Sequence, residues 1–419
     1  MCAVQSECAA AGVAFTFTIR LGDFIQDMSA QLEGGVFCSA PPCFDAAIAN
    51  PPYRKITTES AERRALRLIG VQTSNLYTAF IAVIQRLLVQ GGQLVAITPR
   101  SFCNGPYFRP FRDELLRDVD LRRIHVFESR KGAFREDSVL QENIIFHGVK
   151  SPHQARQIII SSSSGDDGGT VDQRTLPFLE VVHAGDAEKF IHIPSTHEHG
   201  AAKSAMGGLS TSLAALGVTV STGRVVDFRL KGSLRKDPEP GSVPLLYPCH
   251  FNGGTVHWPK LEARKPNAIV DNAETRPWLV PTGTYLLTKR FTSKEERKRL
   301  VACLFDPEEV KTDWVGFENH LNYFHMNGRG LDRPLAWGLF AFLNSTVVDQ
   351  YFRRFSGHTQ VNATDLRTLA YPSRSALEAM GREMSAQRAK TTLDGLARSS
   401  LSLSQDEVDH LVTGYLCAS

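Results

Sequence analysis

The first 150 residues alternate short apolar runs with longer stretches of helical periodicity. The helical stretches are residues 73–92, closed by Gly91 and Gly92, and residues 107–119. The apolar runs are rich in β-branched and aromatic residues, and they predict strands at 13–19, 44–49, 93–99, 121–129 and 142–150. Alternation of this kind is typical of an α/β fold built on a largely parallel sheet.

The pattern changes after residue 160. Residues 161–173, SSSSGDDGGTVDQ, have the composition of a flexible linker, and residues 215–300 combine many glycines and prolines with short strand-like pieces. Residues 334–355 have an apolar face at helical spacing and are predicted to be helical, and polar helices follow residue 374. We therefore expect an α/β domain, a linker with irregular structure, a mixed α+β domain and a helical tail, over residues 1–160, 161–213, 214–374 and 375–419.

Composition narrows the class of protein only a little. The 419 residues are 42% hydrophobic and 22% charged, as in globular proteins of two domains or more. The net charge of +3 permits nucleic-acid binding without requiring it. The chain shows neither a signal peptide nor an apolar run near the roughly 18 residues of a membrane span. None of the eight cysteines forms a CxxC pair, so we expect a cytoplasmic protein with reduced thiols and no zinc ribbon.

The most unusual tetrapeptide, Asn50-Pro51-Pro52-Tyr53, directly follows the predicted strand 44–49. Two prolines end a strand and leave carbonyl groups without an internal donor. The Asn50 side-chain oxygen and the Pro51 carbonyl then form a pair of acceptors suited to both hydrogens of an –NH2 group. Tyr53 offers a flat ring for stacking a heterocycle. These groups predict a site for an exocyclic amine on an aromatic ring, such as adenine N6 or cytosine N4.

The same groups suggest a reaction at that amine. Its lone pair is delocalised into the ring, and two acceptors favour a tetrahedral nitrogen and stabilise the positive charge that develops during attack on an electrophilic carbon. No prior deprotonation is needed. A base in duplex DNA must leave the stack to reach such a turn, and aromatic contacts offset part of that cost.

In this context the tetrapeptide resembles motif IV of amino-directed DNA methyltransferases. The chain resembles in particular the γ-ordered N6-adenine methylases of type II restriction–modification systems, with PstI-type methylases as the nearest subgroup. Gly22-Asp23-Phe24 and residues 132–146, GAFREDSVLQENIIF, are similar to further catalytic segments. The C-terminal half is similar to their target-recognition domains at 220–229, 245–251, 317–325 and 343–366.

This resemblance implies a partial S-adenosylmethionine-dependent, Rossmann-like catalytic domain followed by a DNA target-recognition domain. Asn50, Pro51 and Pro52 would bind the N6 amine, and Tyr53 and Phe134 would stack on the flipped adenine. Asp23 and Phe24 would contact the adenine of the cofactor. The implied partners are double-stranded DNA at an adenine-containing palindrome and a cognate restriction endonuclease that acts in the same system.

One part of the family's pattern is missing. Methyltransferases of this fold bind the cofactor with a glycine-rich loop after the first strand and an acidic residue after the second. Only about twenty residues precede Gly22, and the glycine clusters at 165–170 and 205–212 follow no strand. The family's first two strands lie in the middle of its sheet. We therefore expect an N-terminally truncated methylase in which residues 13–19 lack their native neighbours.

Residues for DNA recognition are less well marked. Basic residues Arg224, Arg229, Lys289 and Arg290 are candidates for phosphate contacts, with a solvated surface as the alternative. His358, Gln360 and Asn362 lie in a segment suited to base reading, or to an Asx turn and helix cap. His197-Glu198-His199 is interpreted as polar surface, and the reaction needs no metal.

Two other functions stay open from the sequence. The first is methylation of cytosine N4, or of a glutamine amide in a protein, which would use a related turn. The second is a DNA-binding remnant without catalysis, or a subunit that needs a partner chain carrying the cofactor loop.

Overall fold

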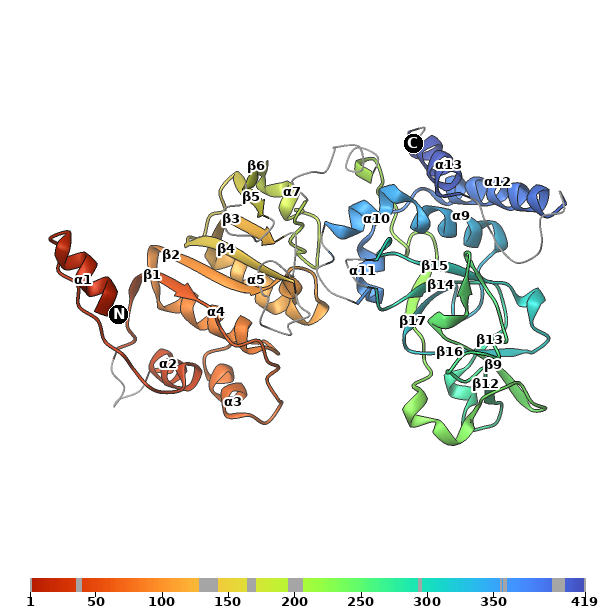
Figure 1. Ribbon diagram of the computed structural model, residues 1–419, viewed down its shortest axis with the longest axis horizontal. Helices are drawn as coiled ribbons and strands as arrows, with labels where there is room; N and C mark the ends of the chain where they lie inside the picture. The colour runs from red at the N-terminus through yellow and green to blue at the C-terminus, as the bar shows by residue number, and fades with distance from the viewer. Residues whose placement is uncertain are drawn as a thin grey trace. The chain divides into compact units, whose positions relative to one another are not determined.

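The computed structural model describes most of the chain, and Figure 1 shows its helices and strands. The described residues are 2–34, 40–127, 142–163, 171–194, 206–292, 296–354, 356, 360–393 and 404–417. The chain divides into two compact units, which are described separately. Unit 1 comprises Met1–Thr98, Pro110–Arg122 and Ile145–Ala155, and unit 2 comprises Pro99–Arg109, Arg123–Ile144 and Arg156–Ser419.

The first sheet has the strand order β1-β2-β4-β3-β5-β6. Its strands are β1 (Phe44–Ala49), β2 (Leu88–Pro99), β3 (Val119–Phe127), β4 (Asn143–Lys150), β5 (Gln157–Ser163) and β6 (Asp172–Pro177). β1 pairs with β2, and β3 with β5, in parallel, whereas β6 is antiparallel to β5. The linker expected over 161–213 is therefore wrong for part of its described length, because Asp172–Pro177 pairs along β5.

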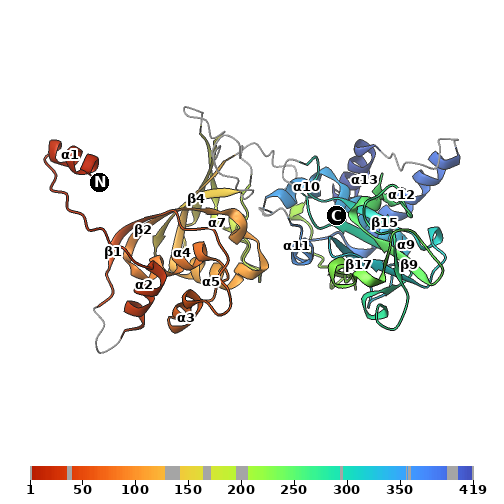
Figure 2. The ribbon, with the colours of Figure 1, turned by 60° about the horizontal axis from the view of Figure 1, so that its bottom comes forward.

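The helices of unit 1 are α1 (Cys2–Ala10), α2 (Phe24–Glu33), α3 (Ala61–Leu68), α4 (Leu76–Leu87) and α5 (Arg109–Asp118). α4 and α5 lie on the same side of β1 and β2 (Figure 2). α4 is the most buried of them, since Ala79, Ile81 and Val83 are inaccessible to solvent. Its apolar periodicity correctly predicted a helix, because nearly all of its faces pack against neighbouring elements.

The glycine pair that was expected to end this helix has another role. α4 stops at Leu87, and Gly91 and Gly92 lie inside β2. Gly91 has a φ of +82°, and a Cβ at Gly92 would come within 2.8 Å of the Val89 carbonyl oxygen. The register between β1 and β2 shifts at this point, so the glycines form a bulge in the strand.

The strand predicted at 13–19 is wrong. These residues are described and adopt no regular structure, and Ile19 is 77% exposed. A β-branched sequence forms a strand only where a neighbouring strand supplies hydrogen bonds, and no described strand pairs with this segment. β1 is also open on one edge within the described residues, and its Ile48 is 89% exposed.

Unit 2 holds two further sheets, of strand orders β10-β11-β15-β14-β17-β7 and β13-β16-β9-β12-β8. The strands are β7 (Thr219–Thr222), β8 (Leu234–Arg235), β9 (Ser242–Leu246), β10 (Phe251–Asn252), β11 (Thr255–Val256), β12 (Ala268–Val270), β13 (Val280–Pro281), β14 (Tyr285–Lys289), β15 (Ala302–Phe305), β16 (Trp314–Phe317) and β17 (Leu321–His325). Cβ atoms alternate across each strand, so β14 sends side chains into two hydrophobic clusters, with Leu286 in one and Leu287 in the other.

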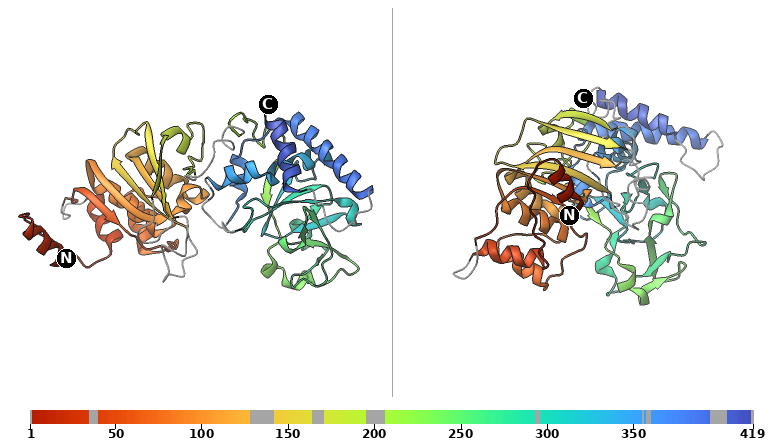
Figure 3. Two further views of the ribbon diagram at one scale, coloured as in Figure 1. Left: turned by 45° about the horizontal axis from the view of Figure 1, so that its top comes forward. Right: turned by 60° about the vertical axis from the view of Figure 1, so that its left-hand side comes forward.

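Helices cover one part of unit 2 (Figure 3). They are α9 (Arg333–Asn344), α10 (Thr346–Arg353), α11 (Ala363–Thr368), α12 (Arg374–Leu393) and α13 (Gln405–Cys417). α7 (Phe178–Val181) packs instead against β5 and β6 of the first sheet. The helical stretch expected over 334–355 is confirmed and forms two helices, because Ser345 is extended and its hydroxyl caps the start of α10. In the described part of the chain no helix is both long and apolar enough to cross a membrane.

Candidate active site

The Asn50–Tyr53 turn lies where β1 ends, at the carboxyl edge of its parallel pair with β2. Asn50 is exposed, Pro51 is buried and Tyr53 is half-buried. The single proton of the Tyr53 hydroxyl lies within reach of two acceptors, Asn50 Oδ1 at 3.1 Å and, at 3.4 Å, the Ile97 carbonyl near the end of β2. The turn is therefore tied to the neighbouring strand through Tyr53.

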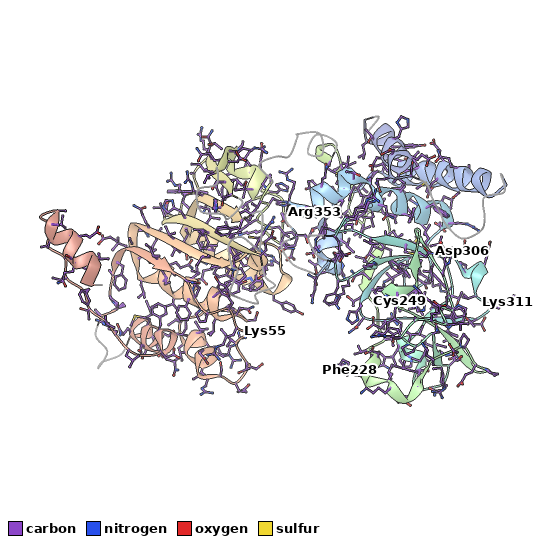
Figure 4. The ribbon with its side chains drawn as sticks, viewed as in Figure 1. Lys55, Phe228, Cys249, Asp306, Lys311 and Arg353 are labelled. Atoms are coloured by element: carbon purple, nitrogen blue, oxygen red, sulfur yellow. The ribbon has the colours of Figure 1, made fainter. Side chains whose placement is uncertain are left out.

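The backbone after the turn is held by a second connection. Lys55 forms an isolated antiparallel bridge with Asn75, and Figure 4 labels Lys55 at this position. The Ile56 N–H donates to the Ser74 carbonyl at 2.8 Å, and the Leu76 N–H donates to the Arg54 carbonyl at 2.9 Å. This pairing fixes the exit of the turn to the start of α4.

The ring of Tyr53 packs edge-on against Tyr77 in the first turn of α4, with 6.2 Å between ring centroids and 85° between planes. Burial raises the pKa of Tyr53 above its ordinary value, so its hydroxyl keeps the proton that it donates to Asn50. The amide of Asn50 thus has a defined orientation, with its oxygen on the side of the tyrosine.

Asp23 and Phe24 lie at the start of α2. Asp23 caps the helix, because its Oδ1 accepts the Gln26 N–H at 3.0 Å, and the side chain is exposed. The Phe24 ring stacks on Phe80 of α4, with 4.9 Å between centroids. An exposed carboxylate beside a ring that stacks on a second ring is an arrangement that could contact the adenine end of S-adenosylmethionine.

Helix α4 therefore joins the two predicted motifs. Tyr77 and Phe80 are three residues apart, so both lie on one face of the helix, one against Tyr53 and the other against Phe24. Sequence reasoning assigned neither residue to the site. The available signal was an aromatic pair at helical spacing soon after the Asn-Pro-Pro-Tyr turn.

In unit 2 the structure brings several predicted recognition residues together around the turn from Glu318 to Leu321. Lys289, the last residue of β14, pairs with Leu321, and the Arg290 N–H donates to the His320 carbonyl at 2.9 Å. Gln360 forms a bridge with Phe291, the residue after Arg290. Arg224 is exposed on a segment whose next residue, Val225, accepts the Asn319 N–H at 2.9 Å.

Two predicted residues of unit 2 lie elsewhere. Asn362 is the N-cap residue of α11, and its N–H donates to Asp365 Oδ2 at 2.8 Å, which is the helix-cap alternative. Arg229 ends the 3-10 helix Asp227–Arg229, 5.7 Å from the ring centroid of Phe228, which Figure 4 labels. Phe134, His358 and His197–His199 lie outside the described residues.

Comparison with known proteins gives the family. A model of the Eco57I restriction-modification methylase family matches residues 23–134. The type II methyltransferase M.PstI of Providencia stuartii is 46% identical over 384 residues, which cover 91% of this chain and 75% of the relative. M.BsuBI of Bacillus subtilis is 47% identical over 366 residues, covering 87% of this chain and 72% of the relative.

The chain belongs to the type II methyltransferases. The family resemblance seen in the sequence is thereby confirmed. The matched span of the Eco57I model begins at Asp23 and reaches Phe134, so it contains every residue predicted for the target base and for the cofactor. Base preference and individual residue roles in this type II methyltransferase stay predictions.

The fold of the type II methyltransferase has a solved counterpart. The type IIL restriction-modification enzyme MmeI, solved in complex with DNA, superposes with a TM-score of 0.51 at 11% identity over 89% of this chain. The chain spans 54% of the length of that enzyme. At this identity the likeness shows the fold alone, and it agrees with the predicted α/β sheet followed by a mixed α+β region.

Proposed function

We propose that this chain methylates adenine N6 in double-stranded DNA, with S-adenosylmethionine as methyl donor, and protects sites from a cognate restriction endonuclease. The observation that carries the proposal is the exposed Asn50 amide at the carboxyl end of β1, held by the Tyr53 hydroxyl at 3.1 Å. Ligand sites of α/β sheets lie at the carboxyl ends of the strands.

The chemistry at this turn is binding and orientation of an amine. Asn50 Oδ1 and the Pro51 carbonyl accept the two N6 hydrogens, and these acceptors stabilise positive charge on nitrogen as the new bond forms. The Tyr53 hydroxyl binds the oxygen of Asn50 and so fixes the orientation of the amide, and the second lone pair of this oxygen would accept a hydrogen of the amine. S-adenosylmethionine supplies an electrophilic methyl group when bound, and Asp23 and Phe24 would contact its adenine.

The target base has to leave the DNA stack to reach the turn. The half-buried Tyr53 ring, backed by Tyr77, offers one face for stacking. The known DNA-bound structure of MmeI and the relation to M.PstI support double-stranded DNA as the substrate.

The test is to identify the product. The chain, purified from a host without adenine methylases, is incubated with S-adenosylmethionine carrying a labelled methyl group and with duplex DNA, and the digested nucleosides are separated. Labelled N6-methyladenine is the expected product. Labelled N4-methylcytosine would move the proposal to the other base, and unlabelled DNA together with no cofactor binding by calorimetry would overturn it for this chain.

A further inference from the structure

The turn from Glu318 to Leu321 joins β16 to β17 and is closed by the Leu321 N–H donating to the Glu318 carbonyl at 2.9 Å. An exposed imidazole ring and an exposed phenyl ring lie close together there. We use the term recognition face for His320 of this turn and Phe291, with Arg290 and Gln360 beside them.

The backbone and the ring of His320 are hydrogen-bonded to the buried carboxylate of Glu318. The Glu318 side chain has no solvent exposure, whereas that of His320 is 47% exposed. Glu318 accepts the His320 backbone N–H at 2.8 Å and its ring Nδ1 at 2.5 Å. A buried carboxylate is costly unless it is hydrogen-bonded. The pair therefore keeps the proton of the imidazole on Nδ1.

The other ring nitrogen, Nε2, lies on the opposite side of the ring from Glu318. It makes no hydrogen bond to any residue that the structure describes. In the neutral imidazole this nitrogen is an acceptor. His320 thus offers one acceptor to solvent with its tautomer and ring direction already set.

Phe291 supplies an apolar contact at the same place. Its ring is 41% exposed and lies 4.9 Å from the His320 ring centroid. The backbone is fixed on both sides, because the Arg290 N–H donates to His320 and the Val361 N–H donates to the Arg290 carbonyl at 2.8 Å. Arg290 also donates from Nη1 to the Asn319 carbonyl at 2.9 Å, so its guanidinium secures the turn.

The charges around His320 favour a base edge over a phosphate. Glu318 lies under the ring, and Asp227, which Lys265 binds at 2.9 Å, is also within electrostatic range. The pKa of Asp227 is lowered chiefly by its hydrogen bond with Lys265. Lys265 balances the charge of Asp227, so Glu318 is the carboxylate that faces the ring, and with the ring neutral its Nε2 suits a partially positive amine better than an anion.

We propose that His320 and Phe291 read base edges in the major groove of the target DNA. Nε2 of His320 accepts a hydrogen bond from the exocyclic amine of adenine or cytosine, and Phe291 packs on the C5-methyl group of a neighbouring thymine. Arg290 and Gln360, predicted from the sequence as DNA contacts, position this pair. The inference rests on the proposed function, since it presumes DNA as the substrate.

The test is selection from a pool of randomised duplexes, with binding rather than methylation as the readout. His320→Asn keeps an NH2 donor for Glu318 and removes Nε2, whereas His320→Gln places an amide at the position of Nε2. His410→Asn on α13 and Leu179→Ala on α7 are matched exposed controls in unit 2.

We expect the wild-type chain to enrich one sequence motif. His320→Asn should lose the preference at one position, with the ratio of specific to non-specific affinity falling about 10- to 100-fold. His320→Gln should retain more of this sequence preference. Phe291→Ala should reduce the preference for an adjacent thymine several-fold. Removing the amine of the contacted base should weaken the wild type and leave His320→Asn unchanged.

The outcomes separate the inference from the proposed function. If the wild type selects a motif and the folded His320 and Phe291 variants select it equally well, the inference is wrong and the methylase proposal stands. If the wild type binds every duplex alike, both the base-reading pair and site-specific methylation are refuted. Methylation without any change in motif between variants would again overturn the inference alone.

Discussion

Strands β1 and β14 are both followed directly by residues of the proposed sites, Asn50 after β1 and Arg290 and Phe291 after β14, yet the two strands are supported differently. β14 pairs with β15 and β17, and Tyr285, Leu286 and Leu287 are fully buried. β1 pairs with β2 alone among the described residues, and its Ile48 is 89% exposed. The recognition face therefore stands on its own hydrophobic core. The Asn50 turn is held instead by α4 and a few hydrogen bonds, so chemistry and stability are separable at β1.

The largest expected effect follows from that separation. Asn50→Ala should lower the rate of methyl transfer about 10²- to 10³-fold, because it removes one of two acceptors for the amine. Its free energy of unfolding should stay within about 0.5 kcal/mol, since the side chain is exposed. Rates from labelled methyl transfer and urea unfolding curves measure the two quantities. A rate within threefold of the wild type would remove Asn50 from the reaction.

The next prediction compares an alanine substitution in each of the two strands. Leu287→Ala in β14 should cost about 2–5 kcal/mol of unfolding free energy, because the side chain is fully buried in an apolar cluster. Ile48→Ala in β1 should change it by less than about 0.5 kcal/mol. Denaturant unfolding of both variants gives the difference. A large cost for Ile48→Ala would show that a further segment covers β1.

The sequence predicted local elements better than their mutual contacts. Apolar runs predicted β1 and most of β2, and helical spacing predicted α4, because these patterns reflect burial along one segment. The pairs Tyr53–Tyr77 and Phe24–Phe80 depend on where α4 lies against the turn and α2, which no local pattern encodes.

Arg290, Gln360 and the segment 317–325 were predicted from the sequence, but the pair of His320 and Phe291 was not, for a similar reason. Glu318 is buried because the chain at Gly223 passes so close that a Cβ there would meet the Phe317 carbonyl oxygen at 2.6 Å. This approach joins residues almost a hundred positions apart.

A smaller effect is expected where helices α9 and α12 of unit 2 are in contact. Gly338 of α9 lies against the backbone of Leu377 in α12, where a Cβ would clash. Gly338→Ala should therefore cost about 1–3 kcal/mol even though alanine favours a helix. Gly414→Ala in α13, with open space at the Cβ position, should gain up to about 1 kcal/mol. Thermal unfolding of the pair measures both, and two stabilising changes would show that α9 and α12 can separate freely.

The smallest expected effect is a difference between the units in their response to acid. In unit 2, burial lowers the pKa values of His192, His250 and His325, whereas His147 and His153 of unit 1 are not buried. A histidine with a lowered pKa in the folded state binds its proton more readily when unfolded. Its contribution to stability is present above the ordinary value of 6.5 and is lost as pH falls toward the folded pKa.

Unit 2 should therefore lose stability as pH falls below about 6.5, with His192 contributing up to about 1.4 kcal/mol per pH unit, while unit 1 changes little. Hydrogen exchange, corrected for its intrinsic pH dependence, reports the two units separately. His192→Gln should flatten the dependence in unit 2, because burial of this ring, next to His183 at 4.1 Å between centroids, disfavours its charged form. The exposed control His410→Gln should leave the dependence intact. Equal acid sensitivity of both units would mean that carboxylates, rather than buried imidazoles, set the response.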